Sequence, residues 1–358
     1  MSAQNPQPKR ILIIKLRHHG DVLLMTPLAT QLKKQYPDAQ IDALIYKETI
    51  DILKFNNDFH QLYSIDRGWK KLGLRMHLSL ELELLRVLKH NCYDLIIHLT
   101  ESWRGALICR FCRPVKSISI DYPRRKGYWW KHSFTHLVKL HHEHTVLTHL
   151  RVLEPLDIPY SNNVPLKLLV ANKDAVCVQQ KLKELGWQKE PFILIHPGAR
   201  WAFKCWDDEK MAKLIRLLLN DGGSVVLTGA PNEFEQTMIS NIKQKMQLTK
   251  KDKLFDLSGQ LSLSELSAAI AQSVCFVGVD SVPMHMAAAL SIKGVALFGA
   301  TKIDIWAPWS DSIRVIDASE YGQIPEPDSI DTNTSMRYLS CIPVQVVYQE
   351  VCKAIKNI

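Results

Sequence analysis

One pattern limits the possible folds of this chain more than any other: a strand-turn-helix motif that occurs once in each half. Residues 11–21 are a short apolar run of strand type, followed by a turn that ends in one carboxylate, Asp21. Residues 276–289 are a buried strand, a sharp turn and the start of a helix of small residues. Apolar runs alternate with helical stretches around both motifs, which predicts parallel, doubly wound sheets. The expected fold class is α/β, with two Rossmann-like halves.

The remaining elements are predicted from the period of the apolar residues. A helix is expected after the first strand, because Leu24, Leu28 and Leu32 recur at a spacing of four. Later strands are expected at residues 41–46, 95–99, 117–120, 192–196, 224–228, 275–277 and 295–298. Later helices are expected near residues 207–220, 232–246, 262–272 and 344–355.

Three prolines and several polar residues between positions 155 and 165 are typical of a linker. A chain of 358 residues is long enough for two domains with separate cores. We expect an N-terminal domain at residues 1–165 and a C-terminal domain at residues 166–342. A final helix within residues 343–358 could pack back on the N-terminal domain.

The excess of positive charge lies entirely in the first part of the chain. Residues 1–155 hold 24 Lys and Arg against 14 Asp and Glu, a net charge of +10, whereas the remainder holds 21 against 22. The first half is therefore expected to bind an anionic partner: nucleic acid, a phosphorylated glycolipid or an acidic membrane surface. The alternative is a solvated surface excess without a partner. No helix-turn-helix, RNP or zinc-finger pattern supports nucleic acid.

The sequence contains no run near the roughly 20 apolar residues of a membrane-spanning helix, and residues 1–8 are polar rather than signal-like. A cytoplasmic protein with reduced thiols is therefore expected. No two aspartates have D-x-D spacing, which argues against a magnesium-held sugar nucleotide. Residues 124–131 mix cations with aromatic rings. They form either an interfacial segment or a loop that packs its two tryptophans inward.

The turn at residues 278–285 is predicted to bind a nucleotide diphosphate. Ser281 can cap the helix that follows, and Pro283 suits its first turn. The free amides of that turn direct partial positive charge at a bound phosphate. The site is therefore expected at the carboxyl end of a strand, where open α/β sheets bind ligands.

Three further segments are expected at the same edge of that sheet. Lys204 can reach a phosphate as a point charge, and Arg200 is a second candidate. The loop that begins at Gly229 brings Glu233, whose carboxylate suits the two hydroxyls of a ribose. The turn around Leu261 could offer backbone groups to an adenine edge. Each segment alone is also compatible with ordinary turns and caps.

Asp21 is interpreted as a general base in the first half. A catalytic base needs a carboxylate that faces the ligand and cations that hold it ionised. Lys15 and Arg17, with His18 and His19, are close enough in sequence to supply that charge. The alternative is that Asp21 only caps the helix.

In this order, the motifs resemble the ADP-heptose:lipopolysaccharide heptosyltransferases, glycosyltransferase family nine. The likeness rests on IIK, GDV and TP within residues 13–27, on HPG with a later lysine and tryptophan within residues 196–206, and on GVDS with a later histidine within residues 278–285. It extends over nearly the whole chain. KLRHHGD near the start and LSCIP at residues 339–343 look most like the third inner-core enzyme, which adds a branching heptose to the second heptose.

The resemblance implies GT-B architecture, in which two Rossmann-like domains face a central cleft, and an inverting, metal-independent reaction without a cofactor. It implies ADP-L-glycero-β-D-manno-heptose as the donor. The implied acceptor is a membrane-anchored lipopolysaccharide core, reached by peripheral contact with the inner membrane. Another GT-B enzyme is the alternative, either a nucleotide-sugar epimerase or a transferase with a different donor sugar.

The resemblance also implies roles at matching positions. Asp21 would deprotonate the acceptor hydroxyl, and Lys204 would stabilise the diphosphate. Family members often have Thr-Gly after the aspartate of the phosphate-binding motif, whereas Ser281 and Val282 stand here, so a differently built turn is expected. The implied donor-binding residues are Arg200, Gly229, Glu233, Leu261, Asp280, Ser281 and His285. The acceptor-binding residues expected with them are Lys15, Arg17, His18, His19, Arg104, Arg124 and Arg125.

Overall fold

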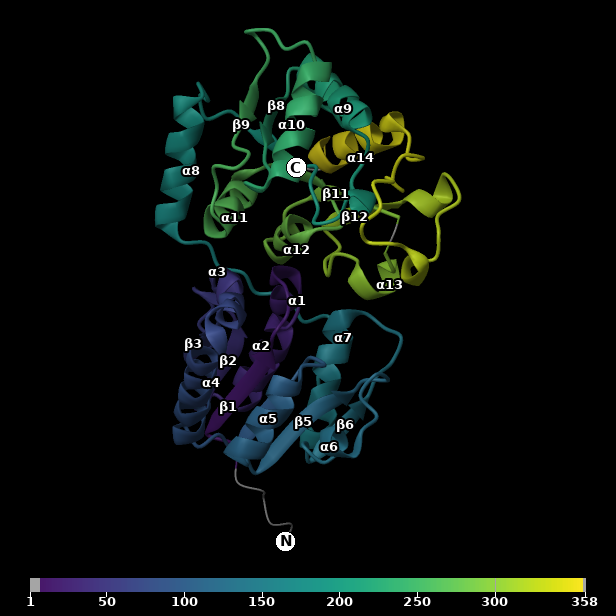
Figure 1. Ribbon diagram of the computed structural model, residues 1–358. Coiled ribbons are helices and arrows are strands. Elements are labelled where there is room, and N and C mark those ends of the chain that lie inside the picture. Colours follow the sequence, from purple (N-terminus) through teal and green to yellow (C-terminus); the bar gives the residue numbers. More distant parts are fainter. Residues whose placement is uncertain (1–6, 300, 357–358) are drawn as a thin grey trace. The chain divides into compact units, whose positions relative to one another are not determined.

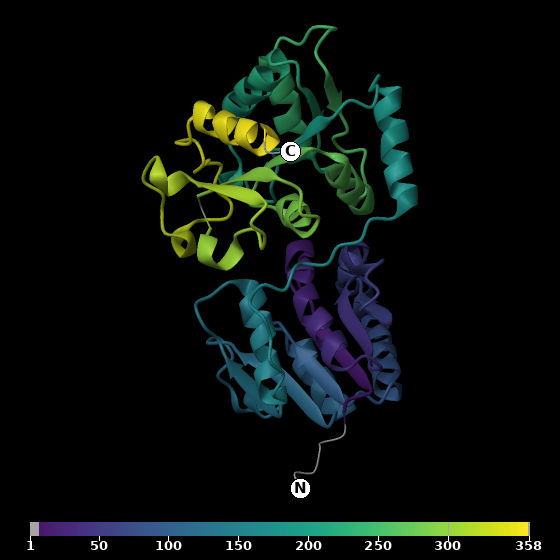
Figure 2. The same cartoon turned by 180° about the vertical axis from the view of Figure 1, so that it is seen from behind.

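The computed structural model describes residues 7–299 and 301–356, and the chain divides into two compact units. Unit 1 ends at Lys167, and unit 2 begins at Leu168. Each unit contains a six-stranded parallel sheet with helices packed on it (Figures 1 and 2). The expected α/β class, with two doubly wound parallel sheets, is confirmed.

The sheet of unit 1 has the strand order β3-β2-β1-β4-β5-β6. The first strand is central because the chain adds strands on one side of it and then on the other. Ile14 of β1 pairs with His98 of β4 at this change of direction. The strands are β1 (Arg10–Lys15), β2 (Gln40–Tyr46), β3 (Gln61–Ile65), β4 (Leu95–His98), β5 (Lys116–Asp121) and β6 (His136–Lys139).

The helices of unit 1 cover both faces of its sheet. Leu12 and Ile14 of β1 share a buried cluster with side chains of α4, α5 and α6, which therefore lie on one face. Helices α2 and α7 contact each other on the opposite face (Figure 2). The α-helices are α1 (His19–Leu23), α2 (Thr26–Gln35), α3 (Ile50–Leu53), α4 (Gly73–His90), α5 (Trp103–Cys112), α6 (Tyr128–Lys131) and α7 (Thr145–Leu150). The 3-10 helices are η1 (Lys47–Thr49), η2 (Arg67–Lys71) and η3 (Arg151–Leu156).

The single helix expected after β1 is divided into two. Helix α1 ends before Leu24, and α2 starts at Thr26 with Pro27 in its first turn. Proline lacks a backbone N–H, so it fits a helix start and interrupts a continuous helix. Leu24, Leu28 and Leu32 are nevertheless fully buried, as their spacing predicted.

The sheet of unit 2 repeats the same arrangement, with the order β12-β11-β10-β7-β8-β9. Its four predicted strands are present, and two further strands lie at the edges. The strands are β7 (Phe192–His196), β8 (Ser224–Leu227), β9 (Leu254–Asp256), β10 (Cys275–Val279), β11 (Gly294–Phe298) and β12 (Ile313–Asp317). The change of direction lies between β7 and β10, where His196 pairs with Gly278.

The helices of unit 2 include the one at the end of the described chain. Helix α14 contacts α9, β10 and β11, and its Val347 and Val351 are fully buried in the core of this unit. These contacts place it within unit 2 rather than in a separate segment. The α-helices are α8 (Asn172–Glu184), α9 (Asp208–Asn220), α10 (Glu233–Lys245), α11 (Leu263–Gln272), α12 (Val282–Ala289), α13 (Ile303–Trp306) and α14 (Val344–Lys356). The 3-10 helices are η4 (Ala202–Lys204), η5 (Ala318–Glu320) and η6 (Pro327–Ser329).

Within the described part of the chain, no helix is both long enough and apolar enough to cross a membrane.

Candidate active site

Asp21 lies beside the point in unit 1 where the sheet changes direction, between β1 and β4. It is in the first turn of α1, where the helix dipole favours a negative charge. Its side chain is 18% exposed, and its Oδ1 is 3.7 Å from Nζ of Lys15. A partly exposed carboxylate next to a fixed cation can stay ionised and accept a proton.

Lys15 supports Asp21 and is not an exposed ligand-binding group. Its Nζ donates to the carbonyl of Leu99 at 3.3 Å and lies 2.9 Å from Nε2 of His149. Nδ1 of His149 lies 3.0 Å from the carbonyl of Leu24. Burial, followed by the charge of Lys15, holds the pKa of His149 well below its usual value. The neutral ring therefore accepts from Lys15 and donates to Leu24, and these buried contacts argue against the expected acceptor contact of Lys15.

The burial of Lys15 leads to a prediction about stability and pH. Burial lowers the pKa of Lys15 from 10.5 to about 8, although the charge of Asp21 opposes the shift. Above about pH 8 the unfolded chain binds this proton more strongly, so the folded parent gains about 1.4 kcal/mol per pH unit. Lys15→Met lacks this gain. In paired thermal melts, the Tm of the parent should rise relative to that of Lys15→Met between about pH 7.5 and 9.5.

Lys47→Met is the matched control, because the side chain of Lys47 is 66% exposed in the same unit. Its Tm difference from the parent should stay constant over that pH range. A constant difference for Lys15→Met as well would contradict the lowered pKa of Lys15 in the folded state.

The other predicted acceptor-binding residues near Asp21 lie between β1 and the first residue of α1. Arg17 is exposed, and its charge contributes to the lowered pKa of Lys15. His18 is the N-cap residue of α1 but makes no side-chain cap bond. His19 donates from Nε2 to the carbonyl of Glu48 at 2.8 Å. Arg17 therefore has the most exposed cationic group of this loop, and an acceptor role for it stays a prediction.

Two residues near Asp21 were not singled out from the sequence. Glu101 follows β4 and Tyr122 follows β5, at the same sheet edge as Asp21. Burial raises the pKa of Tyr122; Arg17 opposes the shift, whereas Glu101 and Asp21 add to it. Their positions directly after two predicted strands were the signal that could have identified them.

The three predicted arginines beyond this loop are in different environments. Arg104 forms a two-point ion pair with Glu81 of α4, so its guanidinium is already engaged. Arg124 is exposed. Arg125 donates from Nε to the carbonyl of Glu101 at 2.8 Å and lies 5.3 Å from the ring of Trp103. Arg125 thus shapes the local loop, and Arg124 is the arginine of the three with its side chain in solvent.

In unit 2, Lys204 and Asp280 meet at the corresponding point, between β7 and β10. Nζ of Lys204 donates to Oδ2 of Asp280 at 2.7 Å, and the hydroxyl of Thr301 donates to the same oxygen at 2.6 Å. Nζ of Lys204 also lies 5.1 Å from the ring centre of Trp201. Asp280 therefore orients the ammonium group of Lys204. Thr301, which was not predicted from the sequence, follows β11 and completes the cluster.

The start of α12 differs from the predicted cap. Ser281 is the N-cap residue, but its hydroxyl donates to the carbonyl of Val279 at 3.3 Å and makes no cap bond. The expected side-chain cap by Ser281 was therefore wrong. Val282 begins the helix and is not among the described residues with positive φ. The amides of a first helical turn have no carbonyl partner within the helix, so this end can accept an anion without a glycine after Ser281.

Glu233 and Glu235 lie in one turn of α10 but face different surroundings. Glu233 is exposed, whereas Glu235 is buried. Oε2 of Glu235 accepts from the amide of Ala230 at 2.7 Å and lies 3.6 Å from Nε2 of His196. Glu235 therefore fixes the loop after β8, and Glu233 keeps its carboxylate available for a ribose.

The other predicted donor residues lie on loops of the same sheet edge or just inside it. Gly229 packs closely on α10, because a Cβ added there would lie 2.3 Å from Ile239 Cδ1 and would displace that side chain. Arg200 is exposed and lies 5.2 Å from the ring of Trp201. Leu261 is half-buried before α11, and His285 is buried within α12. Their contacts with a donor stay predictions.

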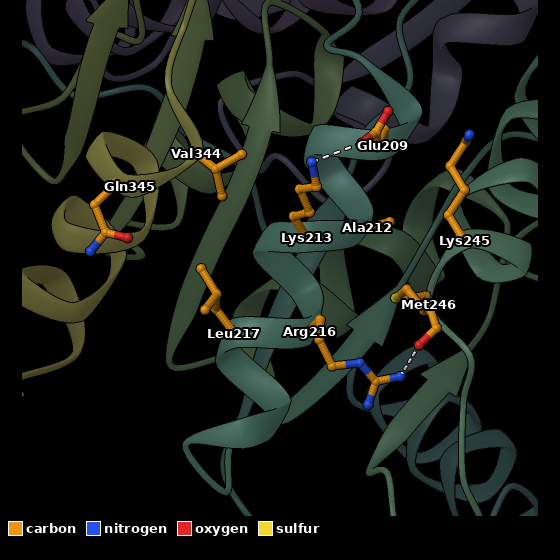
Figure 3. A pocket seen from close by; sticks show the side chains of 9 residues that line it. All are labelled: Glu209, Ala212, Lys213, Arg216, Leu217, Lys245, Met246, Val344 and Gln345. Atoms are coloured by element: carbon orange, nitrogen blue, oxygen red, sulfur yellow. Dashed lines mark hydrogen bonds and ion pairs between the residues drawn. The ribbon is translucent and has the colours of Figure 1, made fainter.

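A pocket of about 640 Å³ lies elsewhere in unit 2, between α9, the end of α10 and the start of α14 (Figure 3). Lys213 and Glu209, which line it, form an ion pair with a 2.8 Å contact. Arg216, which also lines it, donates to the carbonyl of Met246. None of the predicted donor residues lines this pocket. It is therefore separate from the candidate site.

Among the described residues, no group of three or more His, Cys, Asp or Glu side chains is arranged to hold a metal ion.

Comparisons with known proteins agree with this architecture. Residues 82–336 match the family glycosyltransferase family 9 (heptosyltransferase). The chain is 39% identical to lipopolysaccharide heptosyltransferase 3 of Escherichia coli K12, over 93% of this chain and 94% of that protein. A family 9 glycosyltransferase of Veillonella parvula has a similar structure, with a TM-score of 0.83 and 20% identity over 98% of both chains. The structure of E. coli ADP-heptose lps heptosyltransferase II is also similar, with a TM-score of 0.77 and 21% identity over 97% of this chain and 99% of that chain.

Proposed function

The chain belongs to glycosyltransferase family 9, the heptosyltransferases, and we propose that it transfers L-glycero-D-manno-heptose from ADP-heptose to a heptose of the lipopolysaccharide inner core. Its two units have the GT-B type of fold. The observation that carries the proposal is the placement of Asp21 and of the Lys204–Asp280 pair, each at the point where its own sheet changes direction. In open α/β sheets this is where ligands bind.

In the proposed mechanism, Asp21 removes the proton from the acceptor hydroxyl as that oxygen attacks the anomeric carbon. Lys15 is the counter-ion of this carboxylate, and His149 and Leu99 hold Lys15 in place. Attack from the side opposite the departing ADP inverts the anomeric centre. General-base catalysis of this kind contributes roughly 10² to 10⁴ in rate.

Unit 2 would bind the donor and stabilise the departing ADP. The ammonium group of Lys204 and the first-turn amides of α12 provide positive charge for the diphosphate. Asp280 and Thr301 fix the position of Lys204, so the charge needs little rearrangement during the reaction. Glu233 would bind the ribose hydroxyls from α10.

The acceptor would be a membrane-anchored lipopolysaccharide core, and the enzyme would work at the cytoplasmic side of the inner membrane as a peripheral protein. The net charge of +10 on residues 1–155 suits a phosphorylated acceptor and an anionic membrane surface. Exposed cations such as Arg17 and Arg124 would contact the acceptor.

This mechanism predicts that chelation has no effect. Lys204 and the α12 amides supply the charge that magnesium supplies in metal-dependent transferases, so turnover in excess EDTA should equal turnover with magnesium within about twofold. The two turnover rates are measured as initial rates of ADP release by dialysed protein, with EDTA and with magnesium. A tenfold loss that magnesium restores would show that the diphosphate needs a metal.

A second GT-B activity, epimerisation of a nucleotide sugar, is distinguished by its independence of an acceptor. The proposed transferase should release ADP at a rate that depends on the core acceptor. Turnover of the nucleotide sugar at an unchanged rate without acceptor would favour the epimerase.

A further inference from the structure

We infer that unit 1 docks on a lipid bilayer with anionic headgroups through the face formed by α4, α5 and α6. This inference rests on the membrane contact within the proposed function and specifies the surface that makes it. In Figure 1, the three helices belong to the blue part of the chain. The face is defined by two exposed apolar stripes, on α4 and α5, and by two exposed aromatic residues of α6.

The first stripe is on α4. Leu74, Leu78 and Leu82 are 73%, 51% and 48% exposed. Their spacing of four residues puts them on one side of the helix. The buried side uses Leu84 and Leu88 instead. A surface helix of a soluble domain ordinarily turns polar residues outward, so an outward row of leucines indicates a partner.

The second stripe has the same spacing on α5. Trp103, Leu107 and Phe111 are 46%, 60% and 38% exposed. The opposite side of α5 is buried against the sheet through residues that include Ile108 and Cys109. This helix therefore also presents a row of large apolar side chains away from the core.

Two side-chain contacts between α4 and α5 join the two stripes into one surface. Arg104 of α5 pairs with Glu81 of α4, and Nζ of Lys89 in α4 lies 4.7 Å from the ring centre of Phe111 in α5. The two helices are thus bridged at two levels along their length. Their exposed rows lie on neighbouring helices of the same face of the sheet.

Helix α6 extends the surface with aromatic rings. Tyr128 and Trp129 are 73% and 65% exposed, whereas Trp130 is fully buried. Residues 124–131 were expected to form either an interfacial segment or a loop with both tryptophans packed inward. Neither alternative holds completely, because Trp130 packs inward and Trp129 faces solvent. Arg110 of α5 lies 4.5 Å from the ring of Trp129, which connects α6 to the second stripe. Tryptophan and tyrosine are enriched where proteins meet the headgroup region of a bilayer.

Cations flank the apolar stripes. Arg75, Arg86 and Lys89 are exposed on α4 at positions −7, +4 and +7 from Leu82, on the same side of the helix. Arg110 is also exposed, and the carboxylate of Glu81 is neutralised by Arg104. Apolar and aromatic side chains bordered by Lys and Arg match an anionic bilayer, whose surface attracts the cations while the side chains enter the headgroup boundary.

The same charge argues against a second copy of this chain as the occupant. Two such faces would bring like charges together, and charged residues are depleted in the cores of protein interfaces. We therefore assign the face formed by α4, α5 and α6 to contact with an anionic bilayer.

The test compares two triple variants in sedimentation with vesicles of phosphatidylglycerol and phosphatidylethanolamine. The first is Leu78→Gln, Leu107→Gln and Trp129→Gln, with one change on each helix of the face. The matched control is Leu169→Gln, Val176→Gln and Leu185→Gln, which removes three apolar side chains of unit 2 that are 43%, 56% and 44% exposed. The first variant should bind on the order of 10²-fold more weakly than the parent, and the control within about twofold.

Further readouts separate this inference from the proposed function. Parent binding should weaken with salt and with phosphatidylcholine vesicles. Both variants should keep parental turnover on deacylated, water-soluble core acceptor. If the first variant binds vesicles within threefold of the parent, or is monomeric where the parent is a dimer, the bilayer assignment is wrong. If its vesicle binding falls as expected but the parent transfers no heptose, the surface stands and the proposed function fails.

Discussion

Asp21→Asn is expected to lower kcat by roughly 10² to 10⁴, the usual contribution of a general base. Asparagine keeps the shape of the side chain and its place in the first turn of α1 but cannot accept the proton. The fold should be kept with a lower Tm, because the change leaves the buried ammonium group of Lys15 without its counter-ion. ADP affinity should stay at the parental value, because Asp21 lies in unit 1 and the expected nucleotide contacts lie in unit 2. Calorimetry with ADP and initial-rate kinetics measure the two effects separately.

Asp51→Asn is the matched control for this change. Asp51 is also in the first turn of a short helix in unit 1, α3. The Asp51→Asn variant should retain parental turnover within about twofold. If Asp21→Asn also stays within threefold of the parent, Asp21 is a helix-terminal carboxylate without a catalytic role.

Lys204→Ala is expected to lower kcat/KM by roughly 10² to 10³, comparable to the removal of one preorganised donor from a charge-stabilising site. ADP affinity should fall together with kcat, because the ammonium group faces charge both in the bound diphosphate and in the departing ADP. The loss should persist at high salt, since the side chain is only 14% exposed. ADP calorimetry at two salt concentrations, together with kinetics, measures this.

A double variant, Lys204→Ala with Asp280→Asn, separates the loss of the Lys204 charge at the site from a loss of stability. Removal of Lys204 leaves the carboxylate of Asp280, 9% exposed, with Thr301 as its remaining partner among the contacts described above. An unpaired charge of this kind destabilises a fold. The double variant Lys204→Ala with Asp280→Asn should recover thermal stability without recovering activity. Lys213→Ala, which breaks the ion pair with Glu209 away from the candidate site of unit 2, should leave ADP affinity unchanged. Unchanged ADP affinity in Lys204→Ala would remove Lys204 from the diphosphate site.

The sequence predicted the fold well because buried parallel strands are continuous apolar runs. Residues 192–196 and 224–227 were recognisable for that reason, and both are fully buried as β7 and β8. The short edge strand β9 has only three residues, and β12 has exposed positions, so neither gives a continuous run. The break between α1 and α2 was missed because the buried leucines keep their helical spacing across it. Pro27 was the residue in the sequence that indicated a new helix start.

The candidate site was only partly predictable, because side-chain direction depends on contacts between distant segments. Glu233 and Glu235 are two residues apart, yet only Glu235 turns toward His196 and the loop after β8. Lys15 looked like an available cation, but its partner His149 lies 134 positions later in the chain. Thr301 is likewise recognisable only once β10 and β11 are placed side by side. Spacing along the chain identified the loops of the site and could not identify these pairings.

Product analysis with the purified protein tests the proposed transfer most directly. The reaction would contain ADP-heptose and a lipopolysaccharide core acceptor that ends at its second heptose, with linkage mapping by mass spectrometry and NMR. The proposed mechanism should release one ADP for each heptose added, attach the sugar to a core heptose, and invert the anomeric carbon. ADP release without a heptosylated product, or a product with retained configuration, would contradict it.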